Sequence, residues 1–105
     1  MTARTPIFLL ALSALSTHAL SQNDECAGAL TLAVGSTPFD TTSATTSAPV
    51  WPCANGGSDL WYRFTAPNDA VYTFDTCSGG YDTALELFTG TCAALVSVAC
   101  NDDSC

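Results

Sequence analysis

The chain has 105 residues, of which ten are acidic and two basic, and its formal net charge is −8. So acidic a chain repels the phosphates of nucleic acids and of anionic membrane surfaces, and we therefore expect no nucleic-acid partner. The length suffices for one small domain.

The first 21 residues have the pattern of a secretory signal peptide. Arg4 supplies the positive charge, residues 7–20 are mostly apolar, and Ala19 and Ser21 are small residues of the kind that a signal peptidase reads. The apolar run falls short of the roughly 20 apolar residues that span a bilayer, so we expect no membrane span in the mature chain. We predict cleavage after Ser21 and a secreted protein, whether extracellular, periplasmic or at the cell surface.

The predicted mature part, residues 22–105, holds all ten acidic residues and a single basic one, Arg63, which gives a side-chain charge of −9. It also holds all six cysteines, but no lysine and no histidine. An even number of cysteines in a small exported domain indicates disulfides, and the absence of histidine and of C-x-x-C pairs disfavours zinc. Many pairings are possible, and we predict the most local one: Cys26–Cys53, Cys77–Cys92 and Cys100–Cys105.

The mature part begins with a predicted strand that ends at Gly35, followed by a turn and a short second strand up to Asp40. Next, residues 41–49 carry six serines or threonines in nine positions. This composition occurs in O-glycosylated linkers. Because the segment is short and lies between two cysteines, we favour a surface loop within the domain.

The clearest pattern is DLWYRFTAPNDAVYTFDTC, residues 59–77. Side chains alternate with period two on both sides of the turn sequence APNDA, and aromatic and β-branched residues dominate, which predicts an antiparallel hairpin. Two further strands are predicted, TALELFTG at 83–90 and ALVSVAC at 94–100. Leu85 and Leu87 should share one face of the first of them. No sustained helical period is present, so we predict an all-β fold, an antiparallel, jelly-roll-like β-sandwich stabilised by disulfides.

The order of these motifs resembles that of bacterial pre-peptidase C-terminal domains, which are secreted β-sandwich modules often appended to proteases and other exported enzymes. The resemblance covers residues 22–105, and the opening NDECAGALTLAVG is similar to the start of the cysteine-bearing variety. Its motifs are D-x-W-Y-x-F-T-A-P at 59–67, Y-T-F at 72–74, D-T-x-L-x-L at 82–87, Gly90, and N-D-D at 101–103.

The sequence departs from that family in two ways. Tyr81 stands where phenylalanine is commoner, which is a minor difference. The family also continues beyond N-D-D with further strands, which this sequence lacks. The domain is therefore expected to be incomplete at its C-terminal side: a fragment, a truncated reading frame, or a minimal version held by disulfides. A sandwich without its closing strands exposes an apolar face and open edges.

Catalysis requires an activated group, and the predicted mature part lacks the histidine and lysine that activate most nucleophiles. A hydrolase with paired carboxylates remains chemically conceivable. However, Asp59, Asp75, Asp82 and Glu86 lie on short strands or turns, and the sequence gives no sign of a substrate cleft. We predict that the chain is not an enzyme.

The C-terminal CNDDSC allows two interpretations. Asn101, Asp102 and Asp103 offer oxygens of the kind that calcium binds, and Asp82 can approach them, although the spacing is not that of an EF-hand. In the other interpretation, which we favour, the same side chains form the hydrogen bonds of a turn. Calcium is the one cofactor that the sequence suggests, and the resemblance implies it for some relatives only.

Exposed aromatic side chains can bind sugars, and Trp51, between two prolines, is the best candidate for an exposed platform. The predicted function is a non-catalytic secreted module for binding, targeting or stabilisation, with an extracellular protein or polysaccharide as its partner. Two alternatives stay open. One is a carbohydrate-binding or adhesive module that uses aromatic faces, and the other is an accessory fragment of a secreted peptidase or other hydrolase.

Overall fold

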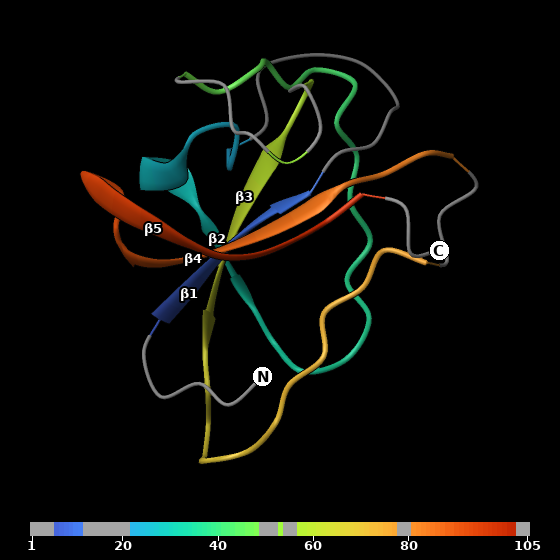
Figure 1. Cartoon of the computed structure of the whole chain (residues 1–105). Helices are drawn as coiled ribbons and strands as arrows, with labels where there is room; N and C mark the ends of the chain where they lie inside the picture. Colours follow the sequence, from blue (N-terminus) through green and yellow to red (C-terminus); the bar gives the residue numbers. More distant parts are fainter. Residues whose placement is uncertain (1–5, 12–21, 49–52, 54–56, 78–80, 103–105) are drawn as a thin grey trace.

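The described residues form five strands and one short 3-10 helix, shown in Figure 1 as a computed structural model of the chain. The structure describes residues 6–11, 22–48, 53, 57–77 and 81–102. The elements are β1 (Pro6–Ala11), η1 (Cys26–Gly28), β2 (Leu30–Leu32), β3 (Leu60–Thr65), β4 (Leu85–Thr91) and β5 (Ala94–Asn101).

The five strands form one mixed sheet in the order β2-β3-β1-β4-β5. β1 is antiparallel to both of its neighbours, β3 and β4. At the two edges β2 runs parallel to β3, and β5 runs antiparallel to β4. The prediction of an all-β, disulfide-containing fold is confirmed.

The sheet carries a buried apolar cluster on each face, because successive side chains of a strand point to opposite faces. We call the larger one the leucine cluster: Leu9, Ala44, Leu60, Tyr62, Phe64, Leu85 and Leu87. The smaller one is the tryptophan cluster: Phe8, Trp61, Ala84 and Phe88. The central strands contribute to both clusters and are therefore buried on both faces.

A layer of extended chain without ladder pairing to β3 covers the leucine cluster. It consists of residues from the segments 33–46 and 66–76, which lie on the same side of the sheet (Figure 1). Tyr72 and Phe74 pack edge-on against Phe64, with ring centroids 5.0 and 5.2 Å apart. This layer takes the place of the second sheet of a sandwich, and the region up to Asp40 that we predicted as a second strand belongs to it.

The predicted hairpin over 59–77 is wrong in its pairing. Its first half is β3, and its second half alternates between half-buried and exposed side chains as expected. However, residues 71–77 form no ladder with β3, because β2 and β1 already occupy the two edges of that strand.

The two later strands are confirmed as β4 and β5, and the structure shows that they pair as a hairpin, with Leu85 and Leu87 both in the leucine cluster. Thr91 pairs with Ala94, so two residues form the connection. Gly90 leads into it with φ +101°, a conformation that other residues rarely adopt, and a Cβ atom there would collide with the carbonyl oxygen of Ala94.

The disulfides differ from the local pairing that we predicted. Cys26 pairs with Cys92 and Cys53 with Cys100, with Cα–Cα distances of 5.7 and 5.6 Å. The predicted pairs Cys26–Cys53, Cys77–Cys92 and Cys100–Cys105 are therefore wrong. Cys77 is also disulfide-bonded, and Cys105 lies outside the described residues.

The observed bridges connect elements that are distant in sequence because the sheet brings the β4–β5 hairpin close to the segments that precede β2 and β3. Their separations of 66 and 47 residues correspond to a loop-closure stabilisation of about 4 kcal/mol each in the chain-entropy description. Two long-range disulfides fit a protein that folds in an oxidising compartment.

The predicted leader contributes a strand to this sheet. Residues 6–11 form β1, between β3 and β4. Cleavage after Ser21 stays a prediction, and it would remove this central strand. None of the helical segments in the described part of the chain is long and apolar enough to cross a membrane.

Peptide mapping without reduction tests the disulfide assignment. We expect linked fragments that join Cys26 to Cys92 and Cys53 to Cys100. The double substitution Cys26→Ala/Cys92→Ala should lower the free energy of unfolding by about 4 kcal/mol in urea titrations, because the denatured chain then regains the entropy of an open loop. A linked fragment joining Cys26 to Cys53 would contradict the assignment.

Candidate functional site

Two buried carboxylates hold the serine- and threonine-rich loop, residues 41–48. Asp24 accepts hydrogen bonds from the backbone N–H of Thr45 at 2.6 Å and from its hydroxyl at 2.7 Å. Asp59 accepts the same pair of bonds from Ser47, at 2.8 Å from the N–H and 2.5 Å from the hydroxyl. Each carboxylate thus replaces the ladder that this loop lacks, which confirms the segment as a loop within the domain.

The same network fixes Trp61 in the core. Its indole N–H donates to the hydroxyl oxygen of Ser47 at 2.9 Å. Its backbone N–H donates to the carbonyl of Asn23 at 2.8 Å, and the side-chain amide of Asn23 donates back to the carbonyl of Trp61 at 3.0 Å. Trp61 is 5% exposed and Tyr62 is 7% exposed. Both are therefore core residues and not platforms for sugars.

Asp59 is fully buried, which disfavours the charged form of its carboxyl. Burial raises the pKa of its carboxyl above the ordinary value of 3.8, and the negative charge of Asp24 adds to this effect. The hydrogen bonds from Ser47 and Trp61 act in the opposite direction. Because Ser47 engages both oxygens, the geometry assigns Asp59 to holding the loop and not to proton transfer with a substrate.

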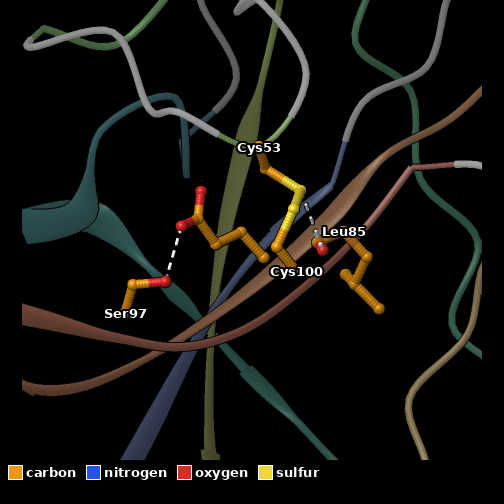
Figure 2. The surroundings of a disulfide bond; sticks show 5 residues. Cys53, Leu85, Ser97 and Cys100 are labelled. Atoms are coloured by element: carbon orange, nitrogen blue, oxygen red, sulfur yellow. Dashed lines mark hydrogen bonds between the residues drawn. A yellow bond between two sulfur atoms is a disulfide. The ribbon is translucent and has the colours of Figure 1, made fainter.

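Glu86 is the other fully buried acid, 1% exposed. Its Oε1 accepts a hydrogen bond from the hydroxyl of Ser97 at 2.7 Å, whereas Oε2 has no hydrogen-bond partner among the residues that the structure describes. Its register partner on β5 is Cys100. Figure 2 shows the Cys53–Cys100 disulfide with Leu85 and Ser97 on either side of it, and Cys53 Sγ lies 3.7 Å from the carbonyl oxygen of Leu85.

A cleft of about 590 Å³ lies over the leucine cluster, between the segments 32–39 and 72–76. Leu9 and Leu85 contribute to its wall from the sheet. Six aromatic side chains line it: Phe39, Tyr62, Phe64, Tyr72, Phe74 and Tyr81. We expected no cleft from the sequence. The alternation of Tyr72 and Phe74 was the available signal, but it indicates burial and does not distinguish a packed core from a cleft wall.

Tyr81 is the most accessible of these rings, with 46% of its surface exposed. The hydroxyl of Tyr72 bonds to the side-chain oxygen of Asn68 at 2.5 Å, which fixes the position of its ring. The polar residues Thr37, Asp75 and Thr76 are also among those that line the cleft. An aromatic surface with a few polar groups at its rim is the usual composition of a small-molecule site.

The predicted calcium ligands lie only partly within the described residues. Asp82, Asn101 and Asp102 are all exposed, and the described His, Cys, Asp and Glu residues include no group of three or more that could hold a metal ion. Asp103 and Trp51 lie outside the described residues. Calcium binding stays a prediction, which melting curves recorded in calcium and in a chelator would test.

The role of Asp59 predicts a contrast with Asp40, an exposed aspartate that also accepts an N–H and a hydroxyl, both from Thr42 at 2.9 and 2.8 Å. Asp59→Ala should lower the free energy of unfolding by about 3 kcal/mol, because the buried donors of Ser47 lose their acceptors. Asp40→Ala should lower the free energy of unfolding by about 0.5 kcal/mol or less, because water can accept the hydrogen bonds of the exposed Thr42 in place of the carboxylate. Urea titrations at neutral pH measure both, and equal losses would contradict the loop-holding role.

The raised pKa of Asp59 also predicts a dependence on pH. The folded chain binds this proton more tightly than the unfolded chain, whose value is near 3.8. The contribution of Asp59 to stability therefore falls as the pH rises from 3.8 through the folded pKa, and it is constant above that. We expect the free energy of unfolding to fall less steeply with pH in Asp59→Asn than in the original chain, when both are measured from about pH 4 to pH 7. An unchanged slope would show that Asp59 is not its source.

No protein-family model, no curated protein and no solved structure matches this chain. The resemblance to pre-peptidase C-terminal domains thus depends on the sequence motifs alone and stays a prediction.

Proposed function

We propose that the chain is an exported, non-catalytic β-sandwich module that binds its ligand in the aromatic cleft. The observation that carries this proposal is the cleft itself, whose accessible aromatic side chains are the half-buried Phe39, Tyr72 and Phe74 and the exposed Tyr81. The long-range disulfides support folding outside a reducing compartment. Residues 22–105 contain no histidine or lysine, which argues for binding and against nucleophilic catalysis.

The cleft favours a neutral saccharide over other extracellular ligands. Aromatic faces stack on the apolar faces of sugar rings, while the oxygens of Thr37, Asp75 and Thr76 can accept bonds from sugar hydroxyls. The excess of acidic residues disfavours anionic polysaccharides. This ligand class matches the carbohydrate-binding alternative from the sequence. It is also compatible with an accessory part of a secreted hydrolase, which would use such a module to reach an insoluble substrate.

Depletion isotherms on insoluble neutral polysaccharides, cellulose and chitin, test the proposal. We expect saturable binding to at least one of them, and Tyr81→Ala should weaken it about tenfold, which corresponds to the loss of about one stacking contact. Tyr81→Phe should bind like the original chain.

Val71→Ala serves as the matched control, because Val71 is 73% exposed and does not line the cleft. It should leave the isotherm unchanged. If neither polysaccharide is bound, or if Tyr81→Ala and Val71→Ala have the same affinity as the original chain, the cleft is not a saccharide site.

A further inference from the structure

The central strand of the sheet comes from the segment that we predict to be removed on export. β1 pairs over six residues with β3, from Pro6↔Thr65 to Ala11↔Leu60, and over four with β4, from Phe8↔Phe88 to Ala11↔Leu85. The other four strands lie within residues 22–105. Without β1, β3 and β4 would face each other across roughly twice the 4.7–4.9 Å spacing of neighbouring strands. We call this gap the slot.

Both faces of the slot are mainly apolar, and the face that holds Phe8 also has Arg63 and the buried Glu86 in register with β1. Leu9 of β1 belongs to the leucine cluster together with Leu60 and Leu85 of the flanking strands. On the other face, Phe8 belongs to the tryptophan cluster with Trp61 and Phe88. Whatever fills the slot must therefore bring bulky apolar side chains to both faces in alternation, and its backbone must pair on both sides.

The slot cannot close by direct pairing of its rims without a rearrangement of the core. β3 and β4 are parallel to each other, since both are antiparallel to β1. Two disulfides that do not involve β1 tie its two sides together. Cys26–Cys92 joins η1 to the β4–β5 connection, and Cys53–Cys100 joins the residues before β3 to β5. These bridges keep β3 and β4 in one covalent frame when β1 is absent.

We propose that the slot is a strand-binding site, which takes up an extended apolar segment of a partner polypeptide, antiparallel to both β3 and β4. Residues 6–11 occupy it before cleavage and show the chemistry of the occupant. It has at least six residues, no charge within them, and large apolar side chains on both faces. This inference depends on the proposed export, because processing is the step that vacates the slot.

Charge complementarity further defines the partner segment. Residues 22–105 carry ten acidic side chains and one arginine, so basic residues that flank an apolar segment would favour association. Strand addition of this kind obtains its affinity from backbone hydrogen bonds and its selectivity from alternate side chains. The slot offers two rows of backbone partners, whereas the edge of a sheet offers one.

A synthetic peptide tests the proposal. The probe has residues 5–12, TPIFLLAL, flanked by two lysines at each end and labelled with a fluorophore. The matched control carries Leu9→Pro/Leu10→Pro, which keeps the peptide apolar but removes one backbone donor from each ladder, because the N–H groups of adjacent residues point to opposite neighbours. The gene for the full chain is expressed in an exporting host, and intact mass shows whether residues 1–21 have been removed.

We expect the processed chain to bind the probe with one-to-one stoichiometry and at least about tenfold more tightly than the control. With a photoreactive group in place of Phe8, cross-links should fall on residues 60–65 and 84–88. The unprocessed full chain, refolded with its disulfides, should bind little probe because β1 fills the slot. Its Phe8→Asp/Leu9→Asp variant should bind the probe, because charged residues displace β1 from the core.

Several results would overturn the proposal: equal affinity for probe and control, cross-links confined to β5 or to the aromatic cleft, or equal binding by the processed and unprocessed chains. If the processed chain does not fold alone, the probe but not the control must raise the yield of oxidised, folded protein, and failure to do so also counts against the slot. Retention of residues 1–21 after export would refute processing. The polysaccharide isotherms measure a different ligand and are diagnosed by a different variant, Tyr81→Ala, so failure of the slot and failure of the proposed function are distinguishable.

Discussion

The fold depends on the continuity of its sheet through β1. This strand forms both central ladders of the sheet, and Phe8 and Leu9 connect its two faces to the two apolar clusters. A strand that is buried on both faces contributes backbone hydrogen bonds and apolar contacts on each side, so its loss has a larger effect than the loss of an edge strand. Because β1 and β2 occupy both edges of β3, residues 66–76 must cover the core as extended chain.

Buried polar hydrogen bonds stabilise segments of the chain that do not pair in the sheet. The loop at 41–48 has no ladder, and the N–H groups and hydroxyls of Thr45 and Ser47 are satisfied by Asp24 and Asp59. A small domain gains little from burying apolar surface alone, so disulfides and buried polar bonds acquire greater weight. The acidic composition thus has a structural role in addition to its effect on net charge, since Asp24 and Asp59 hold the loop, and Asp40 and Glu86 also accept hydrogen bonds within the chain.

Local features of the fold could be predicted from the sequence, but pairings distant in the chain could not. Alternation located β3, β4 and β5 and assigned the faces of Leu85 and Leu87 correctly. It did not reveal that β3 has no free edge, and the local disulfide pairing failed for the same reason, because neighbours across a sheet need not be neighbours in sequence. The apolar run at residues 7–12 is equally suited to a signal peptide and to a strand buried on both faces. The aromatic cleft could not be predicted, because a period-two pattern identifies half-buried side chains and not the empty volume beside them.

Leu9 belongs to both of the proposed sites and therefore connects them. It lies within the leucine cluster as part of the strand that fills the slot, and it also lines the aromatic cleft. A strand that enters the slot therefore completes one wall of the cleft, and a ligand in contact with that wall stabilises the seated strand. This coupling is reciprocal. If a bound strand raises the affinity of the cleft for its ligand by some factor, the bound ligand raises the affinity of the slot for the strand by the same factor. The protein would then respond to two partners together and not to each one separately.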